Sequence, residues 1–349
     1  IDALALSSGM AAISLLMELF KPGDHIIADS DLYGGCIRLF QNVSDKNGIQ
    51  FSNIDCCRED IESYITEQTK AIYIETPTNP MMNVTDIAAT AEIAHKHGLL
   101  LIVDNTFPTP VNCRPIEWGA DIVTHSTTKY MDGHGCGVGG CIVDSGKFDW
   151  NKYADKFPGL TTPDESYHGV VYTERFGLEG AFITKATAQL MRDFGSIQSP
   201  QNAFLLNMGL ESLHVRMAQH VKNGQAVAEY LQAHPKVAWV RYSGLPGDEY
   251  YELAQKYLPN GGCGVVSFGV AGGRTGAETF MKNLKLAQIA THVADARTCV
   301  LHPANATHRQ MNDEELEAAG ISPDLIRLSC GIEATEDLIA DIEQALAAV

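Results

Sequence analysis

The segment LLLIVDNTF at residues 99–107 is followed along the chain by DIVTHSTTK at residues 121–129. Each contains a short apolar run followed by polar side chains, which include Asp104 in the first and Lys129 in the second. Short runs of this kind, rich in β-branched residues and bounded by turn residues, are typical of strands that a parallel sheet buries on both faces. The two segments therefore predict successive strands of an α/β sheet, whose carboxyl ends are where such sheets bind ligands.

The same pattern extends over the first 150 residues. Between the apolar runs lie longer mixed segments such as residues 86–97, whose helical pattern ends at Gly98 as a helix C-cap should. This alternation of strands and helices predicts an α/β domain with a mostly parallel sheet and right-handed crossovers. The other strands expected in it are residues 3–6, 25–28, 71–75 and 140–143.

The second half of the chain reads differently. Prolines and glycines predict a long irregular insertion over residues 145–180, before a helix that begins at Ser199-Pro200 and runs to about His234. Fewer buried strands follow, which predicts a smaller α+β domain at residues 208–349 after a larger one at residues 1–207. The elements expected in the smaller domain are strands 237–242, 264–270 and 325–329 and helices 276–284 and 335–348.

The composition excludes several classes of partner. The 349 residues carry a formal net charge of −18 and no Lys/Arg-rich run, so the surface should repel nucleic acid and anionic membranes. The longest apolar runs are about ten residues, too short to span a bilayer. Nine cysteines without a paired framework suit reduced thiols, which predicts a cytoplasmic location. Because the chain opens at Ile1 inside an apolar segment, we also expect an N-terminal portion to be missing.

Asp104 and Lys129 are the pair that points to chemistry. A buried carboxylate is costly unless it is paired, so Asp104 should have a cationic partner. Lys129 is flanked by the hydroxyls of Ser126 and Thr128, which an extended segment would place on one side. A desolvated lysine can form a Schiff base, and pyridoxal phosphate needs such a lysine, an Asp against its pyridine nitrogen and donors for its phosphate. Taken singly, Asp104 could be a structural ion pair or helix cap and Lys129 a solvated loop residue.

The segment Ser7-Ser8-Gly9-Met10 supplies a candidate anion site. It follows the first apolar run and opens a helix, where backbone N–H groups and the positive end of the helix dipole attract anions. With Ser126 and Thr128 it would form a phosphate cup, although an ordinary helix N-cap is the simpler alternative.

Two competing motifs are rejected. Gly135, Gly137 and Gly140 match the spacing GxGxxG, but they lead into a strand and not into the helix that a dinucleotide site requires. No metal site is expected either, because structural zinc needs four closely spaced ligands. The residues considered and set aside as ligands are His134, Cys136, Cys141, His302 and His308.

Six segments together resemble one known family. In order along the chain they are SSGMAAI, LYGG, ETPTNP, VDNTF, HSTTKYMDGHG and LIRLSCGIE, and they are spread over most of its length. The family is the γ-class of fold-type I pyridoxal-phosphate enzymes of cysteine and methionine metabolism. The resemblance implies an aspartate-aminotransferase-like domain that binds pyridoxal 5′-phosphate over residues 1–207.

The resemblance also implies roles for single residues. Lys129 would hold the cofactor through a Schiff base, Asp104 would keep its pyridine nitrogen protonated, and Tyr33 would stack on the ring and assist proton transfer. Asn79 would contact the ring hydroxyl and the substrate carboxylate, which Arg327 would clamp with its guanidinium fork. The residues implied at the phosphate are Ser8, Gly9, Met10, Ser126 and Thr128.

Within the family, residues 159–177 and the helical stretch after them are similar to O-acetylhomoserine sulfhydrylases. The implied reaction converts O-acetyl-L-homoserine and sulfide, or a small thiol, to L-homocysteine and acetate in methionine biosynthesis. Methionine γ-lyases usually carry a cysteine where this chain has Gly35, with Cys36 one position later. A methionine γ-lyase, a cystathionine γ-synthase and a non-catalytic α/β binding protein remain the alternatives.

The resemblance also implies an oligomeric state, and this sequence differs from the family pattern at a few positions. It implies a homotetramer built from dimers that share active sites, to which the family's N-terminal arm contributes a Tyr and an Arg. In the loop before Asp295, His292 and Ala294 replace the family's usual Ser or Asn and Gly. His292 could change the choice of acyl group or be a tolerated loop change. Cys330 stands where a valine is common and reads as a packing replacement.

Overall fold

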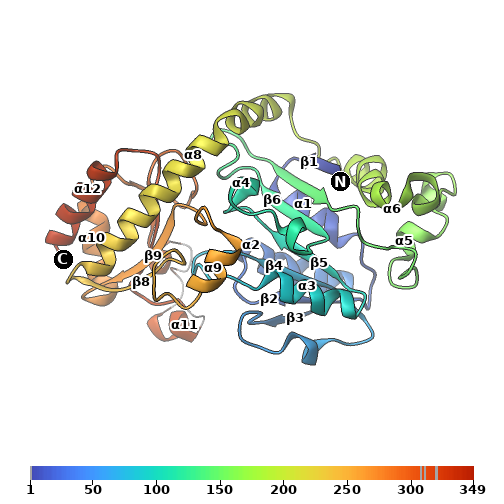
Figure 1. Cartoon of the computed structure of the whole chain (residues 1–349), viewed down its shortest axis with the longest axis horizontal. Coiled ribbons are helices and arrows are strands. Elements are labelled where there is room, and N and C mark those ends of the chain that lie inside the picture. The colour runs from blue at the N-terminus through green and yellow to red at the C-terminus, as the bar shows by residue number, and fades with distance from the viewer. Residues whose placement is uncertain (1, 307–308, 310–311, 319–320) are drawn as a thin grey trace.

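A computed structural model of the chain describes residues 2–306, 309, 312–318 and 321–349 and contains two β-sheets. Helix α8 (Pro200–Ala233) runs from the larger sheet to the smaller one, as Figure 1 shows. Ser199 caps this helix by accepting a hydrogen bond from the backbone N–H of Asn202 at 3.2 Å, so the expected helix start is confirmed. None of the helices in the described part of the chain is both long and apolar enough to cross a membrane.

The larger sheet has seven strands in the order β1-β7-β6-β5-β4-β2-β3. Strands β2 to β6 pair in parallel, which confirms the predicted α/β architecture with a mostly parallel sheet. The strands are β1 (Asp2–Leu6), β2 (His25–Asp29), β3 (Gln50–Ile54), β4 (Thr69–Glu75), β5 (Leu100–Asp104), β6 (Ile122–Ser126) and β7 (Gly140–Asp144).

Two strands do not run as expected. The segments 3–6 and 140–143 were predicted as buried parallel strands, but β7 pairs antiparallel with both β6 and β1. The reason is the connection: residues 127–139 form a loop without a crossover helix, and a parallel return needs such a crossover. Strand β1 lies at the edge, and three of its five residues are exposed. The polar edge strand β3 was not predicted at all.

Helices cover both faces of this sheet. One face packs an apolar cluster against α1, α2 and α6, and the other packs a second cluster against α3 and α9. The insertion predicted as irregular contains α5 and the start of α6, which Gly177 interrupts with a φ of 73°. The helices in the part of the chain before α8 are α1 (Gly9–Met17), α2 (Gly34–Leu39), α3 (Ile87–Lys96), α4 (Thr109–Asn112), α5 (Pro158–Thr161), α6 (Tyr172–Lys185) and α7 (Arg192–Phe194).

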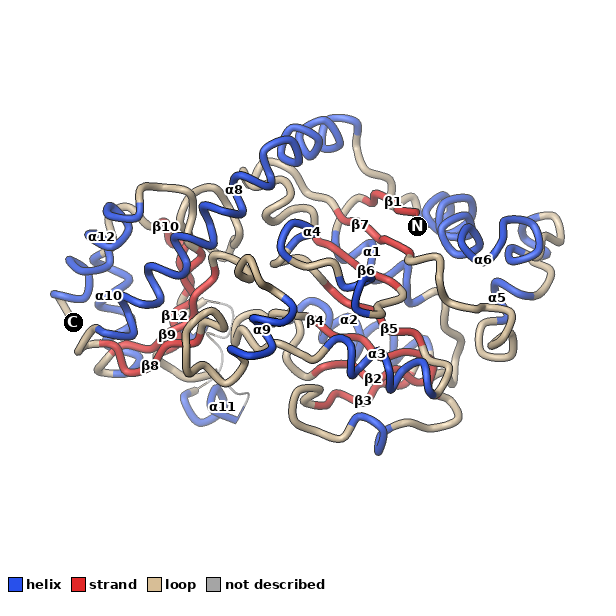
Figure 2. Tube along the Cα trace, in the orientation of Figure 1, coloured by secondary structure: helices blue, strands red, loops and turns tan. Residues whose placement is uncertain are grey.

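The smaller sheet lies at the other end of the molecule, on the left in Figure 2. Its order is β10-β11-β12-β9-β8, and its two short strands, β10 and β11, were not predicted. The predicted boundary between residues 207 and 208 falls inside α8, so the division into two domains stays a prediction. The elements that follow α8 along the chain are β8 (Val237–Arg241), β9 (Val265–Val270), β10 (Gln288–Ile289), β11 (Cys299–Leu301), β12 (Leu325–Ser329), α9 (Tyr251–Tyr257), α10 (Gly273–Asn283), α11 (Asp313–Ala318) and α12 (Thr335–Ala347).

A buried guanidinium fastens α8 to the segment that follows β6. Arg216 donates hydrogen bonds to the carbonyl oxygens of Tyr130 and Gly209, both at 2.7 Å, and to the hydroxyl of Ser212 at 3.0 Å. Only 5% of Arg216 is exposed. Because buried carbonyl groups need donors, this side chain fixes the path of the chain directly after Lys129.

The first prediction follows from Arg216. Arg216→Met keeps an apolar stem but leaves the carbonyl group of Tyr130 without its Arg216 donor, whereas that of Gly209 still accepts from the hydroxyl of Ser212 at 3.3 Å. Since a buried unsatisfied group costs about 1–3 kcal/mol, we expect a loss of about 2 kcal/mol in the free energy of unfolding. Urea unfolding measures it, with Arg192→Met on the exposed part of α7 as the control. A loss no larger than that of the control would contradict this role.

Candidate active site

Three parallel strands end at one edge of the larger sheet and place polar groups there. Glu75 at the end of β4 pairs in register with Asp104 at the end of β5, and Asp104 pairs with Thr124 on β6. Side chains at alternate positions share a face of a sheet. Glu75, Asp104 and Ser126 therefore all point to the face that α1 covers, where Tyr73 and Ile102 also pack.

Asp104 is held by neutral donors. The backbone N–H of Thr106 donates to its carboxylate at 3.0 Å, and the hydroxyl of Thr106 donates to the same oxygen. Burial raises the pKa of Asp104, while these hydrogen bonds oppose the rise. No Lys, Arg or His side chain within the described ranges forms an ion pair with Asp104. The cationic partner expected for Asp104 is thus not a side chain of this part of the chain.

Lys129 lies in a turn beyond the end of β6 and is partly buried. The expectation of an extended segment there is wrong, because the chain turns directly after Ser126. The hydroxyl of Thr128 is tied to Gly139, whose N–H donates to it at 3.1 Å. Burial and, second, the positive charge of Arg327 lower the pKa of Lys129 to about 8. The amine is therefore easier to deprotonate than an ordinary lysine.

The start of α1 forms one wall of the site. Ser8 is the N-cap of this helix, and its hydroxyl accepts from the N–H of Ala11 at 3.0 Å. The N–H groups of Gly9 and Met10 have no backbone partner among the described residues. A Cβ atom on Gly9 would lie 2.8 Å from the Cβ of Ser126, so glycine is what lets the helix start approach β6. The N-cap and the anion site predicted here are compatible with each other.

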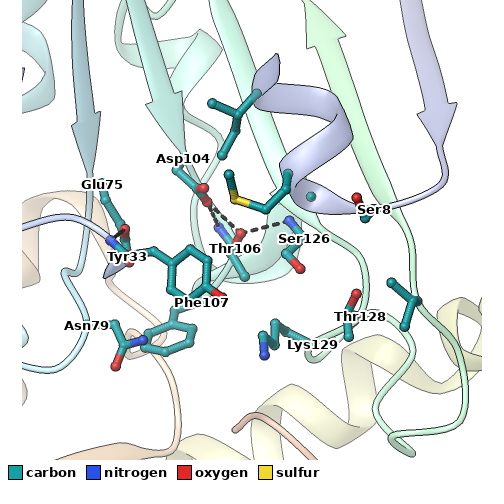
Figure 3. A pocket seen from close by; sticks show the side chains of 14 residues that line it. Ser8, Tyr33, Glu75, Asn79, Asp104, Thr106, Phe107, Ser126, Thr128 and Lys129 are labelled. Atoms are coloured by element: carbon teal, nitrogen blue, oxygen red, sulfur yellow. Dashed lines mark hydrogen bonds between the residues drawn. The ribbon is translucent and has the colours of Figure 1, made fainter. Parts of the chain in front are cut away.

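These groups line one cavity of about 210 Å³. Figure 3 shows Asp104 at its upper wall, Lys129 at its lower wall, and Ser8 and Ser126 beside the start of α1. All nine residues predicted to bind the cofactor line it: Ser8, Gly9, Met10, Tyr33, Asn79, Asp104, Ser126, Thr128 and Lys129. The sequence reasoning missed the other five lining residues, Ile13, Glu75, Thr106, Phe107 and Val138. Glu75 and Thr106 stand in the quoted motifs ETPTNP and VDNTF, which could have indicated them.

Tyr33 lies at the mouth of this cavity and is 48% exposed. A Cβ atom on Gly35 would lie 2.3 Å from the ring of Tyr33, so glycine at this position leaves room for the ring. Cys36 is fully buried in the apolar cluster behind Tyr33 and lines neither this cavity nor the adjoining one described next.

A second cavity of about 390 Å³ shares Tyr33 and Asn79 with the first and contains Arg327. Arg327 comes from β12 in the smaller sheet, is 7% exposed, and donates to the Oδ1 atom of Asn79 at 3.2 Å. Its other nitrogen donates to the carbonyl oxygens of Thr291 at 3.0 Å and His292 at 3.3 Å. Burial lowers the pKa of Arg327 to about 10. The structure thus brings the predicted carboxylate clamp to the edge of the cofactor cavity.

The loop with the unusual residues touches Arg327 through its backbone. The side chain of His292 turns toward Asp295, 3.5 Å away, and lines neither cavity. Ala294 is buried with a φ of 65°, a conformation that favours glycine, and its N–H donates to Ser329 at 2.8 Å. Cys330 is buried in the core of the smaller sheet, as a packing replacement requires.

The structure also shows where the glycine motif and the candidate metal ligands lie. Gly135 and Gly137 lie in the loop that leads into β7 at Gly140, so no helix follows them. Within the described residues no group of three His, Cys, Asp or Glu could hold a metal ion. His308 lies outside the described residues.

Comparisons with known proteins agree on one family. The family model described as "Cys/Met metabolism PLP-dependent enzyme" matches residues 1–347. The chain is 47% identical over 348 residues to the homocysteine synthase of Schizosaccharomyces pombe, which covers 99% of this chain and 81% of that protein. It is 41% identical over 349 residues to O-acetyl-L-homoserine sulfhydrylase 1 of Thermus thermophilus, which covers 99% of this chain and 82% of that protein.

A solved structure has the same fold. It belongs to a Campylobacter jejuni protein assigned as an O-acetylhomoserine (thiol)-lyase, and it superposes with a TM-score of 0.92 at 34% identity. The match covers 99% of this chain and 82% of that one, and that structure carries a lysine as N′-pyridoxyl-lysine-5′-monophosphate.

The second prediction concerns the Lys129 amine. Because its pKa is lowered to about 8, half of it should be neutral near pH 8, and the neutral share should grow as the pH rises. Competitive acetylation of the cofactor-free protein, read by mass spectrometry, should give a midpoint near pH 8 for Lys129. Lys152, whose pKa is raised by its contact with Tyr153, should titrate more than two pH units higher and is the internal control. A Lys129 midpoint close to that of Lys152 would contradict the lowered pKa.

Proposed function

The chain belongs to the Cys/Met metabolism PLP-dependent enzyme family, and on this premise we propose that it exchanges the acetate of O-acetyl-L-homoserine for sulfide. The products would be L-homocysteine and acetate, a step of methionine biosynthesis. The cofactor is pyridoxal 5′-phosphate. One observation carries the proposal: a single cavity holds an easily deprotonated lysine opposite a buried carboxylate, and an arginine from the smaller sheet lines the adjoining cavity, which shares Tyr33 and Asn79 with the first.

The donor set of this cavity fits the cofactor. Asp104 lacks a side-chain cation within the described ranges, and a protonated pyridine nitrogen would supply one. The N–H groups at the start of α1, with the hydroxyls of Ser126 and Thr128, suit a phosphate. When bound, pyridoxal phosphate supplies the electron sink that stabilises negative charge at the Cα atom of an amino acid.

The residues of this chain would then bind the substrate and move its protons. The guanidinium of Arg327 would hold the substrate carboxylate, together with the Asn79 amide that it already contacts at 3.2 Å. The Lys129 amine, neutral in a large fraction near pH 8, would take the proton from the Cα atom. Tyr33 at the mouth of the cavity is the candidate for proton transfer nearer the Cγ atom, where acetate leaves.

The choice of a replacement reaction within the family rests on two observations. The relatives with full-length similarity include a homocysteine synthase and O-acetyl-L-homoserine sulfhydrylases. In this chain Gly35 lies where methionine γ-lyases usually have a cysteine, and the thiol of the neighbouring Cys36 is buried away from the cavity. Both favour sulfhydrylation over γ-elimination. Methionine γ-lyase and cystathionine γ-synthase activity on the same residues remain the alternative.

We also infer a homotetramer built from dimers that share active sites, located in the cytoplasm. Support comes from exposed apolar side chains on α7, α8 and the segment between them: Phe194, Ile197, Phe204 and Met208. Exposed apolar groups gathered in this way mark interaction surfaces. This surface adjoins the cavity, because Asn202 on α8 donates to the carbonyl of the cavity residue Val138 at 3.0 Å. The free cysteines suit a reducing cytoplasm.

The third prediction is the product pattern. The cofactor-loaded enzyme is mixed with O-acetyl-L-homoserine, with and without sulfide, and L-homocysteine and 2-oxobutyrate are measured. We expect homocysteine only when sulfide is present, and little 2-oxobutyrate in either case, because a replacement reaction forms its product only when sulfide takes the place of the departing acetate. Lys129→Ala should abolish both products. Rapid 2-oxobutyrate without sulfide would instead identify a γ-lyase, and no product with either mixture would overturn the proposed substrate.

A further inference from the structure

Glu75 faces the same cavity as Asp104 but has none of the roles discussed so far. The two residues end neighbouring strands and pair in register. Only 6% of Glu75 and 7% of Asp104 is exposed, and Figure 3 places both carboxyl groups in the wall of one cavity. Two buried carboxyl groups this close repel each other when both are ionised. Such a pair favours a state with one proton between them.

The hydrogen bonds decide which carboxyl group keeps that proton. Asp104 accepts from the backbone N–H of Thr106 at 3.0 Å and from the hydroxyl of the same residue. That hydroxyl is itself an acceptor for the N–H of Ser126 at 2.9 Å, which leaves its proton directed at Asp104. Donors of this kind stabilise the charged form of a carboxyl group. The negative charge therefore belongs on Asp104.

Glu75 is less well supplied with donors. One of its oxygens accepts from the backbone N–H of Tyr33 at 2.8 Å. No hydrogen bond to its other oxygen is formed by the residues that the structure describes, so this oxygen is available to carry a proton. A neutral carboxyl group can still accept the N–H of Tyr33 through its carbonyl oxygen.

The charged groups named around Glu75 point the same way, since they are acids and only the backbone N–H of Tyr33 opposes them. Besides Asp104 on β5, they are Asp29 at the end of β2 and Asp31 just after it, while the hydroxyl of Tyr73 and the thiol of Cys36 lie close by. Burial and, second, the charge of Asp104 raise the pKa of Glu75 well above its usual value.

We propose that Glu75 is a positioning residue that holds the one proton of the Glu75–Asp104 pair, so that Asp104 remains the carboxylate that faces the pyridine nitrogen of the cofactor. The same neutral side chain anchors the backbone of Tyr33 at the start of α2. The proposal rests on the proposed function only through the cofactor site. Its first test needs no turnover, so its failure can be told apart from failure of the proposed reaction.

The test is an infrared difference spectrum of the cofactor-loaded enzyme at pH 8. Glu75→Gln keeps the size of the side chain and an acceptor for the N–H of Tyr33, so we expect it to fold. The spectrum of the native enzyme minus that of Glu75→Gln should contain the carbonyl band of a protonated carboxylic acid. The control is Glu62→Gln, because hydrogen bonds from His97 and Lys96 lower the pKa of Glu62 and keep it ionised. Absence of the band, or its persistence in Glu75→Gln, would overturn the proposal.

A second measurement separates a proton-holding role from a merely structural one. The visible absorbance of the bound cofactor is titrated with pH in the native enzyme and in Glu75→Gln. Replacing a neutral acid by a neutral amide should move the midpoint by less than about 0.3 pH unit, whereas removal of a buried negative charge should move it by more than about one unit. Asp104→Asn, which does remove a charge, should give the larger shift. A large shift in Glu75→Gln would show that Glu75 is ionised and would refute the assignment.

Discussion

The rest of the site depends on one constraint, the shared end of three parallel strands. Strands β4 and β5 stop in register and β6 runs two residues further, so Glu75, Asp104 and Ser126 lie on one face at one edge. That edge is out of water, and each polar group there needs a partner. The hydroxyl of Thr106 serves two of them, since it accepts from Ser126 and donates to Asp104. The Ser126 and Asp104 sides of the cavity are thereby joined through one side chain.

The other parts of the fold bring the remaining groups to this edge. The loop after β6 carries Lys129, and Arg216 from α8 holds the turn that follows it. The smaller sheet contributes Arg327, which reaches across to Asn79. A site divided in this way can bind a cofactor on the larger sheet and a substrate carboxylate from the smaller one. Lys129 is buried against the larger sheet and also lies near the positive charge of Arg327 from the smaller one. Burial and, second, this charge lower its pKa.

Much of this arrangement could be predicted from the sequence, and the failures have physical reasons. Apolar runs ending on Asp104 and near Lys129 predict strands whose ends meet, because parallel strands share an edge. Periodicity does not indicate which way a neighbouring strand runs, so the predicted parallel direction of β1 and β7 is wrong. Glu75 stands in the motif ETPTNP, but an acid at a strand end shows no role of its own until the register pairs it with Asp104. The extended geometry expected around Thr128 failed because the chain turns there.

We expect Lys129, at this edge of the sheet, to hold pyridoxal 5′-phosphate. Reduction of the cofactor-loaded protein with borohydride, followed by peptide mass spectrometry to locate the pyridoxyl group, tests this. A Schiff base between the cofactor and an amine is trapped by this treatment as a stable secondary amine. We predict one pyridoxyl group per chain, on Lys129. A pyridoxyl group on another lysine, such as the buried Lys185 at the end of α6, or no trapped group at all, would contradict it.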